Sequence, residues 1–427
     1  MDMAKQFFRT VNPHLLSAVM AAGRSNDIAA SRDLVDESGA VLWPRGRRVD
    51  ETLAQCLLER KLRHPLEVCL GARDGLDARE LHAAYLAFAE SDDGLACAVK
   101  PWVQWLGDDV PRLSLHPVAQ LLLTVARATR PHSFEHAVRG MVLAGAMSAS
   151  AGSSRQDLQL ALLGGLLHDV AELYVPPHCI DTAHALDARS FKQMAVHPRI
   201  GELVLGSLTD YPGALARAVG EHHERLNGSG YPSQRTAASM SPLGRLLAVV
   251  ETTLGVASTT CAPCARSSLA LRLVPGEFDG AWDGFIAAAS QRAQEDLEAA
   301  TLDESGDALD QLALMDAQLA LAAEQAVALE KGEASMVVTH VATRAHGMLD
   351  RLRAGWNAMG LWSVLQADGP AQALFEIQVV RQELRYRMRR IQRECLWPES
   401  DLSVRDALRL EPLWAFLAPQ AHAAAPA

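Results

Sequence analysis

The chain has 427 residues, more than one ordinary hydrophobic core holds, which indicates two or three domains. Its composition, 49% apolar and 21% charged, is typical of a globular protein. Its formal net charge of −11 argues against broad, non-specific binding of nucleic acid, because such binding needs a positive field, and its seven scattered cysteines do not form a disulfide framework.

The apolar segments of the chain bear on its location. The first ten residues lack the apolar core of a signal peptide. No run of 18 or more apolar residues occurs, and the best stretch, residues 158–167, is roughly half as long as a transmembrane helix requires. The sequence therefore predicts a cytoplasmic protein without a membrane span.

Residues 1–75 are predicted to form a small mixed α+β module. Segments 28–34 and 41–43 have the residues of short strands, and the Asp-Glu-Ser-Gly run at 36–39 supplies turn residues between them. Four leucines then follow at helical spacing, namely Leu53, Leu57, Leu58 and Leu62.

The rest of the chain is predicted to be helical, because Ala and Leu dominate it and aromatic residues are scarce. Residues 76–124 are expected to be a helical connector, and residues 125–295 a block of helices broken by glycines and prolines. Residues 296–417 are expected to form a C-terminal helical region, followed by a disordered tail at 418–427. The predicted fold class is therefore mainly α, with a small α+β N-terminal module.

Six of the fifteen histidines form an ordered series within the helical block. They are His132, His136, His168, His197, His222 and His223. His132 and His136 are four residues apart, so on a helix they share one face and could meet one ion. His168 is followed by Asp169 at the end of an apolar run, and the two oxygens of that carboxylate could bridge two metals.

A buried acid completes this series. Glu251 lies in an apolar run at 246–254, where an unpaired carboxylate is costly and a metal ion would remove that cost. Taken singly, each residue also has a structural interpretation, since His132 could cap a helix and Glu251 could pair with Arg245. The combination is the specific signal: His-Asp, then His-Pro, then His-His-Glu, then a buried acid, all within one helical block.

On these residues the sequence resembles the HD-GYP family, a branch of the HD-domain metal phosphohydrolases. The family's second hallmark, H-H-E-x-x-D-G-x-G-Y-P, is matched at 222–232 by H-H-E-R-L-N-G-S-G-Y-P. The resemblance covers residues 125–295 and implies an HD-type helical bundle core. A weaker likeness relates residues 1–75 to the small domain that precedes some members.

The resemblance implies a function and a set of site residues. Members hydrolyse cyclic di-GMP with two or three divalent ions, commonly iron or manganese, which mixed histidine and carboxylate ligation also favours. Carried over by position, the metal ligands would be His136, His168, Asp169, His197, His222, His223 and Glu251. His132 falls where some members supply a ligand to an extra metal. Asp169 would bridge the ions beside His168, and a metal-bridging hydroxide would attack the phosphodiester. Arg225, Tyr231 and Arg266 are the candidate substrate-binding residues.

Four departures from the family pattern concern the substrate more than the metals. The usual H-D-x-G-K reads H-D-V-A-E, so that Glu172 replaces a lysine and would repel an anionic substrate. Glu251 and Asn227 each stand where the family has aspartate. The basic D-R-P-Y-R segment is replaced at 258–264 by S-T-T-C-A-P-C, which leaves Arg266 as a substitute. The metal cage is therefore predicted to be nearly complete and the substrate clamp to be eroded.

This division leaves three functions open. The chain could be a cyclic di-GMP phosphodiesterase, a phosphohydrolase of another nucleotide, or a catalytically weak or inactive signalling or scaffold protein. In the last case the loop at 228–232 could bind a diguanylate cyclase (GGDEF) partner, as the family resemblance suggests. A homodimer is a further expectation for the C-terminal region.

Two smaller features also have alternative interpretations. Cys261 and Cys264 form a C-x-x-C pair, which could be a redox pair or half a zinc site, although two ordinary thiols are favoured. The arginine-rich segment 381–393 could contact nucleic acid or anionic lipid, but an acidic partner within the chain is favoured by the negative net charge.

Overall fold

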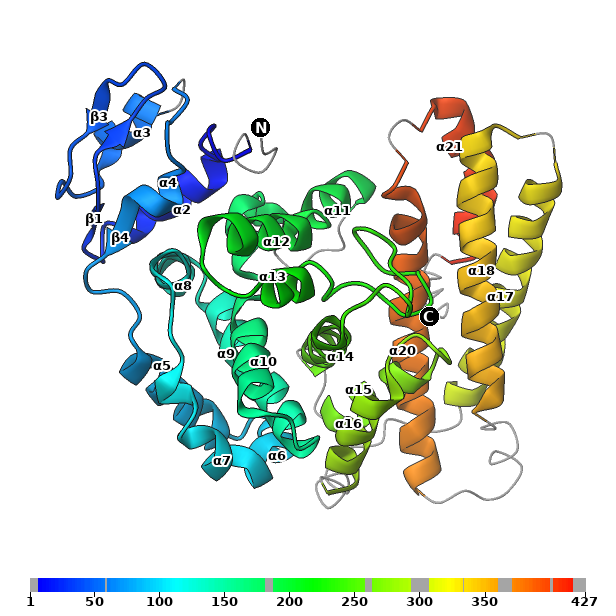
Figure 1. Ribbon diagram of the computed structural model, residues 1–427. Helices are drawn as coiled ribbons and strands as arrows, with labels where there is room; N and C mark the ends of the chain where they lie inside the picture. The colour runs from blue at the N-terminus through cyan, green and yellow to red at the C-terminus, as the bar shows by residue number, and fades with distance from the viewer. Residues whose placement is uncertain are drawn as a thin grey trace, which may run out of the picture.

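The computed structural model describes residues 7–57, 60–180, 187–257, 263–292, 307–332, 334–359, 371–399 and 402–417. These residues form a mainly helical molecule, which confirms the predicted fold class (Figure 1). A small module with short strands precedes a central block of helices, and a group of long C-terminal helices packs against one side of that block. The tail predicted at 418–427 lies outside the described residues, and the boundaries drawn between the domains stay a prediction.

The N-terminal module combines short helices with two small sheets. Its elements are α2 (Pro13–Ala22), β1 (Ile28–Ala30), β2 (Leu34–Val35), β3 (Val41–Trp43), α3 (Glu51–Leu57), α4 (Leu66–Cys69) and β4 (Leu70–Ala72). Strand β1 pairs antiparallel with β4, and β2 pairs antiparallel with β3. The strand predicted at 28–34 is therefore present only in part, because β1 ends at Ala30 and Leu34 already belongs to β2. The chain changes sheet after Ala30, where the next amide, that of Ser31, still donates to Cys69 at 2.8 Å.

The regular elements described in the connector and the central block are helices joined by loops, apart from an isolated β-bridge between Asn227 and Thr236. The connector contains α5 (Ala78–Ala89), α6 (Ala96–Val99), η1 (Lys100–Trp102), α7 (Val103–Gly107) and η2 (Val110–Arg112). The central block contains α8 (Pro117–Thr129), α9 (Pro131–Ser150), α10 (Arg155–Leu167), η3 (Val170–Tyr174), η4 (Pro177–Cys179), α11 (Ala188–Met194), α12 (His197–Leu208), α13 (Gly213–Val219), α14 (Pro242–Ala257), α15 (Pro263–Arg272) and α16 (Gly280–Arg292). One continuous apolar core extends from Phe8 in the module to Ala289 in α16.

Helices α9 and α10 approach each other through two glycines. A Cβ atom added at Gly165 would lie 2.2 Å from the carbonyl oxygen of Gly140, and one at Gly140 would lie 3.0 Å from the ring of His168. Only glycine permits this close backbone contact. The contact brings the middle of α9 against the end of α10, where the His-Asp pair begins.

The described residues of the C-terminal region add three long helices, one shorter helix and a second apolar core. They are α17 (Asp307–Lys331), α18 (Met336–Ala358), α20 (Ala371–Leu396) and α21 (Val404–Ala415). Within α17, residues 310–331 are long and apolar enough to cross a membrane, with a third of that window buried. This is weak evidence for a span, because α17 packs along α18, as the core helix of a folded domain does.

Helix α20 joins this region to the central block. The Arg387 guanidinium donates to Glu277 at 2.7 Å and to the carbonyl of Ala270 at 2.8 Å, and it pairs with Glu383 at 2.8 Å. Arg381 and Arg385 both donate to Gln311 of α17, at 2.9 and 2.7 Å. The arginine-rich segment thus has acidic and amide partners within the chain, as the sequence favoured.

Candidate metal centre

The predicted metal ligands that meet in the structure come from five segments of the chain. His136 lies on α9, Glu251 lies on α14, and His197 is the first residue of α12. His168 and Asp169 occupy the break between α10 and η3, where both side chains leave the helical repeat. His222 and His223 follow the end of α13.

A first group of ligand-type atoms gathers between α9, α10 and α14. It consists of His136, His168, Asp169 and Glu251, whose nearest atoms all lie within 4.8 Å of one another. His136 Nε2 is 3.2 Å from His168 Nε2 and 3.0 Å from Glu251 Oε2. Asp169 Oδ2 is 3.3 Å from His136 Nε2 and 3.3 Å from His168 Nε2. Four ligands at this spacing are sufficient to enclose one divalent ion.

A second group shares Asp169 with the first. It consists of Asp169, His197, His222 and His223, again within 4.8 Å of one another. Asp169 Oδ1 is 3.1 Å from His197 Nε2 and 3.2 Å from His222 Nε2, and these two nitrogens are 3.1 Å apart. The two oxygens of Asp169 therefore face different groups, which is the arrangement of a bridging carboxylate.

The backbone fixes which ring nitrogen faces the centre. His168 Nδ1 donates to the carbonyl of Gly165 at 2.8 Å, and His197 Nδ1 donates to that of Met194 at 2.8 Å. His222 Nδ1 donates to the carbonyl of Val219 at 2.6 Å. Because a carbonyl can only accept, each Nδ1 carries a proton and each Nε2 is turned inward, as in metal-ligating histidines.

The charges at the centre call for a cation. Asp169 Oδ1 is buried and has no hydrogen-bond partner among the described residues, although two ring nitrogens approach it. Burial lowers the pKa of His136, but Asp169 and Glu251 outweigh it and raise the pKa to about 9. Burial would raise the pKa of Asp169, yet His168 and His136 hold it well below its usual range. Protons on these rings thus occupy positions that divalent ions would take, and the donor set fits such ions.

Two histidines of the second group behave differently from those of the first. Burial lowers the pKa of His223 well below its ordinary value, with His222 adding to the effect, and burial also lowers the pKa of His222. These two imidazoles are therefore neutral near pH 7. Neutral imidazole is the form that binds metal.

His132 is the predicted ligand that the structure leaves outside. Its side chain is 98% exposed and lies 3.5 Å from Glu135 Oε2, and it belongs to neither group. The expectation that it meets an ion together with His136 is wrong, because α9 begins at Pro131. His132 therefore lies in the first turn at the surface, about 6 Å along the helix axis from His136.

The two candidate arginines are turned into the protein. The Arg225 guanidinium lies 4.8 Å from the Phe278 ring centroid, donates to Thr252 Oγ1 at 3.0 Å, and has Glu277 at 4.0 Å. Arg266 is 6% exposed on α15. Neither is presented to solvent, so the structure does not support a role for them as a phosphate clamp.

Tyr231 lies directly against the metal ligands. Its ring stacks on His223 with centroids 4.5 Å apart and an interplanar angle of 20°. Its loop is held by Glu224, which accepts from the amides of Ser233 at 2.6 Å and Arg235 at 2.9 Å. The third residue of the His-His-Glu run thus positions the 228–232 loop over the histidines.

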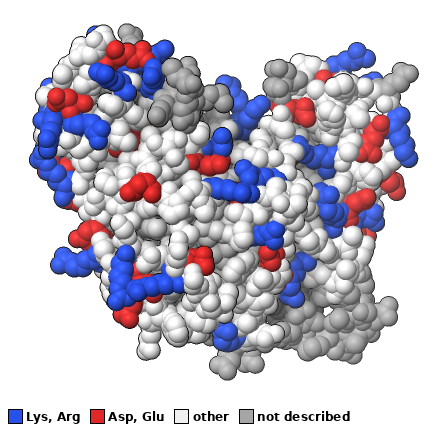
Figure 2. Space-filling view, viewed as in Figure 1, with Lys and Arg blue, Asp and Glu red and all other residues white. Residues whose placement is uncertain are grey.

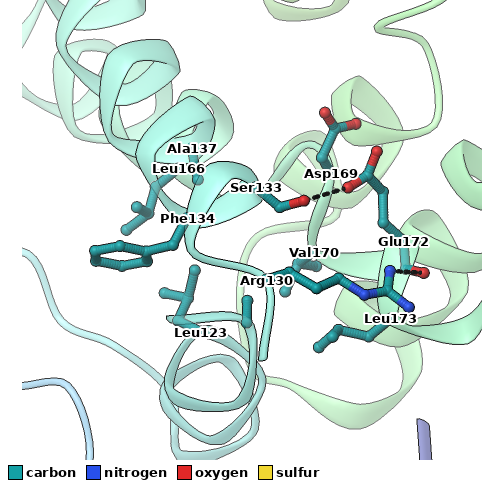
Figure 3. A pocket seen from close by; sticks show the side chains of 11 residues that line it. Leu123, Arg130, Ser133, Phe134, Ala137, Leu166, Asp169, Val170, Glu172 and Leu173 are labelled. Atoms are coloured by element: carbon teal, nitrogen blue, oxygen red, sulfur yellow. Dashed lines mark hydrogen bonds between the residues drawn. The ribbon is translucent and has the colours of Figure 1, made fainter. Parts of the chain in front are cut away.

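Glu172 occupies the place of the missing lysine. Its carboxylate accepts from Ser133 Oγ at 3.0 Å, and its backbone carbonyl accepts from Arg130 at 2.7 Å. Figure 3 shows the Asp169 and Glu172 carboxylates side by side at the edge of a small cavity, with Ser133 reaching Glu172. Burial, followed by the charge of Asp169, raises the pKa of Glu172 to about 7. The sequence did not point to Ser133 and Arg130, because nothing in their own neighbourhood marks them.

Comparison with known proteins identifies this region. Residues 120–253 match the family model of the HD domain. The chain is 26% identical over 234 residues to a cyclic di-GMP phosphodiesterase of Pseudomonas aeruginosa, which covers 53% of each chain. It is 27% identical over 127 residues to 3'3'-cGAMP-specific phosphodiesterase 3 of Vibrio cholerae, covering 30% of this chain and 27% of that one.

A third relative matches a shorter stretch of the chain. The chain is 29% identical over 110 residues to a cyclic di-GMP phosphodiesterase response regulator of Xanthomonas campestris, which covers 26% of this chain and 29% of that one. The match thus spans about half the length of the first of these relatives and less than a third of the other two. Together with the His-Asp pair and the 222–232 motif, these matches show that the chain contains an HD domain of the HD-GYP type.

Proposed function

We propose that the chain is a metal-dependent phosphodiesterase that hydrolyses cyclic di-GMP or a closely related cyclic dinucleotide. The observation that carries the proposal is Asp169, whose two oxygens face two separate groups of ligand-type atoms. The names of the relatives, which act on cyclic di-GMP or 3'3'-cGAMP, support this substrate class.

The chain's own residues would prepare the site for this reaction. Iron or manganese, the ions we propose, would polarise the phosphodiester and lower the pKa of a water molecule when bound. His168, His197 and His222 are oriented by backbone carbonyls, so their Nε2 atoms need no rearrangement to bind. The Tyr231 ring covers His223 and excludes water from that side.

A second candidate function is a non-catalytic signalling or scaffold protein of the same fold. The observation that favours it is Glu172, whose carboxylate stands beside Asp169 where a positive charge would assist an anionic substrate. A GGDEF partner at the 228–232 loop, a homodimer and a cytoplasmic location remain predictions under either function.

Activity and metal content measured on one sample would separate the two functions. Full-length protein, reconstituted with Mn²⁺ or anaerobically with Fe²⁺, would be incubated with cyclic di-GMP and with 3'3'-cGAMP, and linear products would be separated by chromatography. We expect hydrolysis that is lost in EDTA and restored by the metal. Metal-loaded protein that forms no linear product from either nucleotide would favour the scaffold.

The neighbouring histidines of α9 provide a matched pair of variants. His136→Ala should lower both metal content and hydrolysis, because His136 touches two other ligands. His132→Ala should change neither, because its side chain is exposed and outside both groups. Equal effects of the two substitutions would contradict the proposed ligand set.

A further inference from the structure

The C-terminal end of α20 lies beside the metal centre. Helix α20 passes between the central helices and α17–α18, and its upper end lies next to α11 (Figure 1). Lys192 of α11 donates to the backbone carbonyl of Glu399, just beyond α20, at 3.2 Å. Figure 2 shows Lys and Arg side chains gathered along the middle of this face, between the central and C-terminal helices.

A short chain of aromatic rings connects α20 to a metal ligand. The Trp397 ring lies 6.3 Å from the Tyr231 ring, and Tyr231 stacks on His223 at 4.5 Å. Phe191 of α11 also packs edge-on against Tyr231, with ring centroids 5.4 Å apart. Trp397 is therefore separated from His223 by a single ring.

Two arginines of α20 accompany these rings. The Arg393 guanidinium lies 5.0 Å from the centroid of Phe191. Its Nε is buried and makes no hydrogen bond to a described residue. Arg390, one turn earlier, pairs with Glu394 at 2.7 Å and donates to Tyr386 at 2.6 Å. Among the described residues, Glu394 is the carboxylate that pairs with this couple, so the end of α20 carries excess positive charge.

Arg390 and Arg393 lie near each other at this end of α20. Burial lowers the pKa of Arg393, and the nearby Arg390 lowers it further. An anion beside Arg393 would therefore be stabilised by this positive charge, while Arg390 is already paired with Glu394.

The two arginines that the sequence suggested for the phosphate do not supply cations at this point. Arg225 is enclosed by Thr252, Phe278 and Glu277, and Arg266 is buried. Residue 172 is a glutamate. A cyclic dinucleotide carries two phosphodiester anions, so cations from another part of the chain would favour its binding.

We propose that Arg390 and Arg393, together with the Trp397 ring, bind a phosphate group and a base of a cyclic dinucleotide at the metal centre. This proposal rests on the proposed function, since it places the same substrate in the same site. A guanidinium can bind two phosphate oxygens at once, and a tryptophan ring can stack on a base. The C-terminal helical region then completes a site whose metal ligands all belong to the HD domain.

Calorimetric titration of the metal-loaded, full-length protein with cyclic di-GMP, and separately with 3'3'-cGAMP, tests the proposal. We expect Arg393→Gln to weaken binding about tenfold or more, because a charge-assisted hydrogen bond is lost. Arg389→Gln removes the same charge from an exposed position on the same helix and should change the Kd by less than about twofold. Metal content measured in parallel should be equal in all proteins.

Two further variants guard against misfolding as an explanation. Arg393→Lys keeps the charge but not the fork of donors, and it should give a smaller loss than Arg393→Gln. Trp397→Leu should weaken binding without changing metal content. The proposal is overturned if Arg393→Gln binds like Arg389→Gln, or if the wild-type protein binds neither nucleotide at millimolar concentration.

Binding and hydrolysis together distinguish this proposal from the proposed function. Binding that depends on Arg393 without any hydrolysis would reject the phosphodiesterase and keep the binding surface. Hydrolysis whose KM is unmoved by Arg393→Gln would reject the binding surface and keep the phosphodiesterase.

Discussion

The proposed site has two parts that are built in different ways. The metal face consists of the ligand-type histidines and carboxylates, and the cation face consists of Arg390, Arg393 and Trp397. On the metal face, three histidines are aimed by carbonyls three residues before them, so their geometry follows from the local backbone. On the cation face, Arg390 and Arg393 come from α20 and Trp397 follows its last residue, more than a hundred residues further along the chain. That helix is held by side-chain ion pairs such as Arg387 with Glu277. The orientation of these histidines is therefore independent of where α20 packs, whereas the arrangement of the cation face depends on it.

The largest effect should come from removing the residue on which the metal face depends. Asp169→Asn takes one negative charge from a carboxylate that faces both groups. We expect hydrolysis to fall by roughly 10²-fold or more and bound metal to decrease, because both ions lose an anionic ligand. Elemental analysis and product chromatography would measure this. Full metal occupancy in Asp169→Asn would show that Asp169 is not shared between two ions.

Breaking the tie between α20 and the central block should affect stability next. Arg387 is mostly buried and bonds to Glu277 and Glu383, so Arg387→Met leaves Glu383 without this counter-charge and leaves Glu277 with the more distant Arg225. Removing one partner of a buried ion pair costs about 3–5 kcal/mol. Denaturant unfolding would measure the loss, and nucleotide binding should weaken while metal content stays near normal. If Arg387→Met lost metal as strongly as it lost nucleotide binding, the metal face would not be independent of the cation face.

Widening the α9–α10 contact should disturb the metal face alone. Gly165→Ala places a Cβ 2.2 Å from the carbonyl oxygen of Gly140, so the two helices must separate. Overpacking of this kind costs about 1–3 kcal/mol. Because His136 and His168 stand on these two helices, metal affinity should fall as well. Gly284→Ala, on α16 with open space around it, is the matched control and should be near neutral.

The sequence predicted the metal face better than the rest of the site because most of its ligands lie in short sequence motifs. The His-Asp pair, His197, the His-His pair and Glu251 all converge in the structure. His132 was wrongly predicted to be a ligand because helical spacing shows which face of a helix a residue lies on, but not whether that turn of the helix is buried. The 28–34 segment was misjudged because its two halves pair with different strands, one of them about forty residues away. The surface formed by Arg390, Arg393 and Trp397 had no sequence signal, since it exists only after α20 packs on α11.

The smallest predicted effect lies where the N-terminal module meets the segment that follows Asp169. Glu67 is buried, and burial raises its pKa although Tyr174 donates to it at 2.7 Å. The unfolded chain therefore ionises Glu67 at lower pH than the folded one. Its contribution to stability is fully present below about pH 4.5 and is lost as pH rises toward the folded pKa.

Glu67→Gln keeps an oxygen that can accept from Tyr174 but cannot ionise. The variant should therefore gain a few degrees in Tm over the wild type at pH 8 and little at pH 4.5, as measured by thermal unfolding. Glu51→Gln, at an exposed position of the same module, is the control and should show no such pH-dependent difference. A gain of the same size at both pH values would mean that the buried charge of Glu67 is not what opposes folding. In that case the contact between the module and η3 would depend on its packing and on hydrogen bonds such as that from Asn12 to the Tyr174 carbonyl at 3.1 Å, and not on the charge of Glu67.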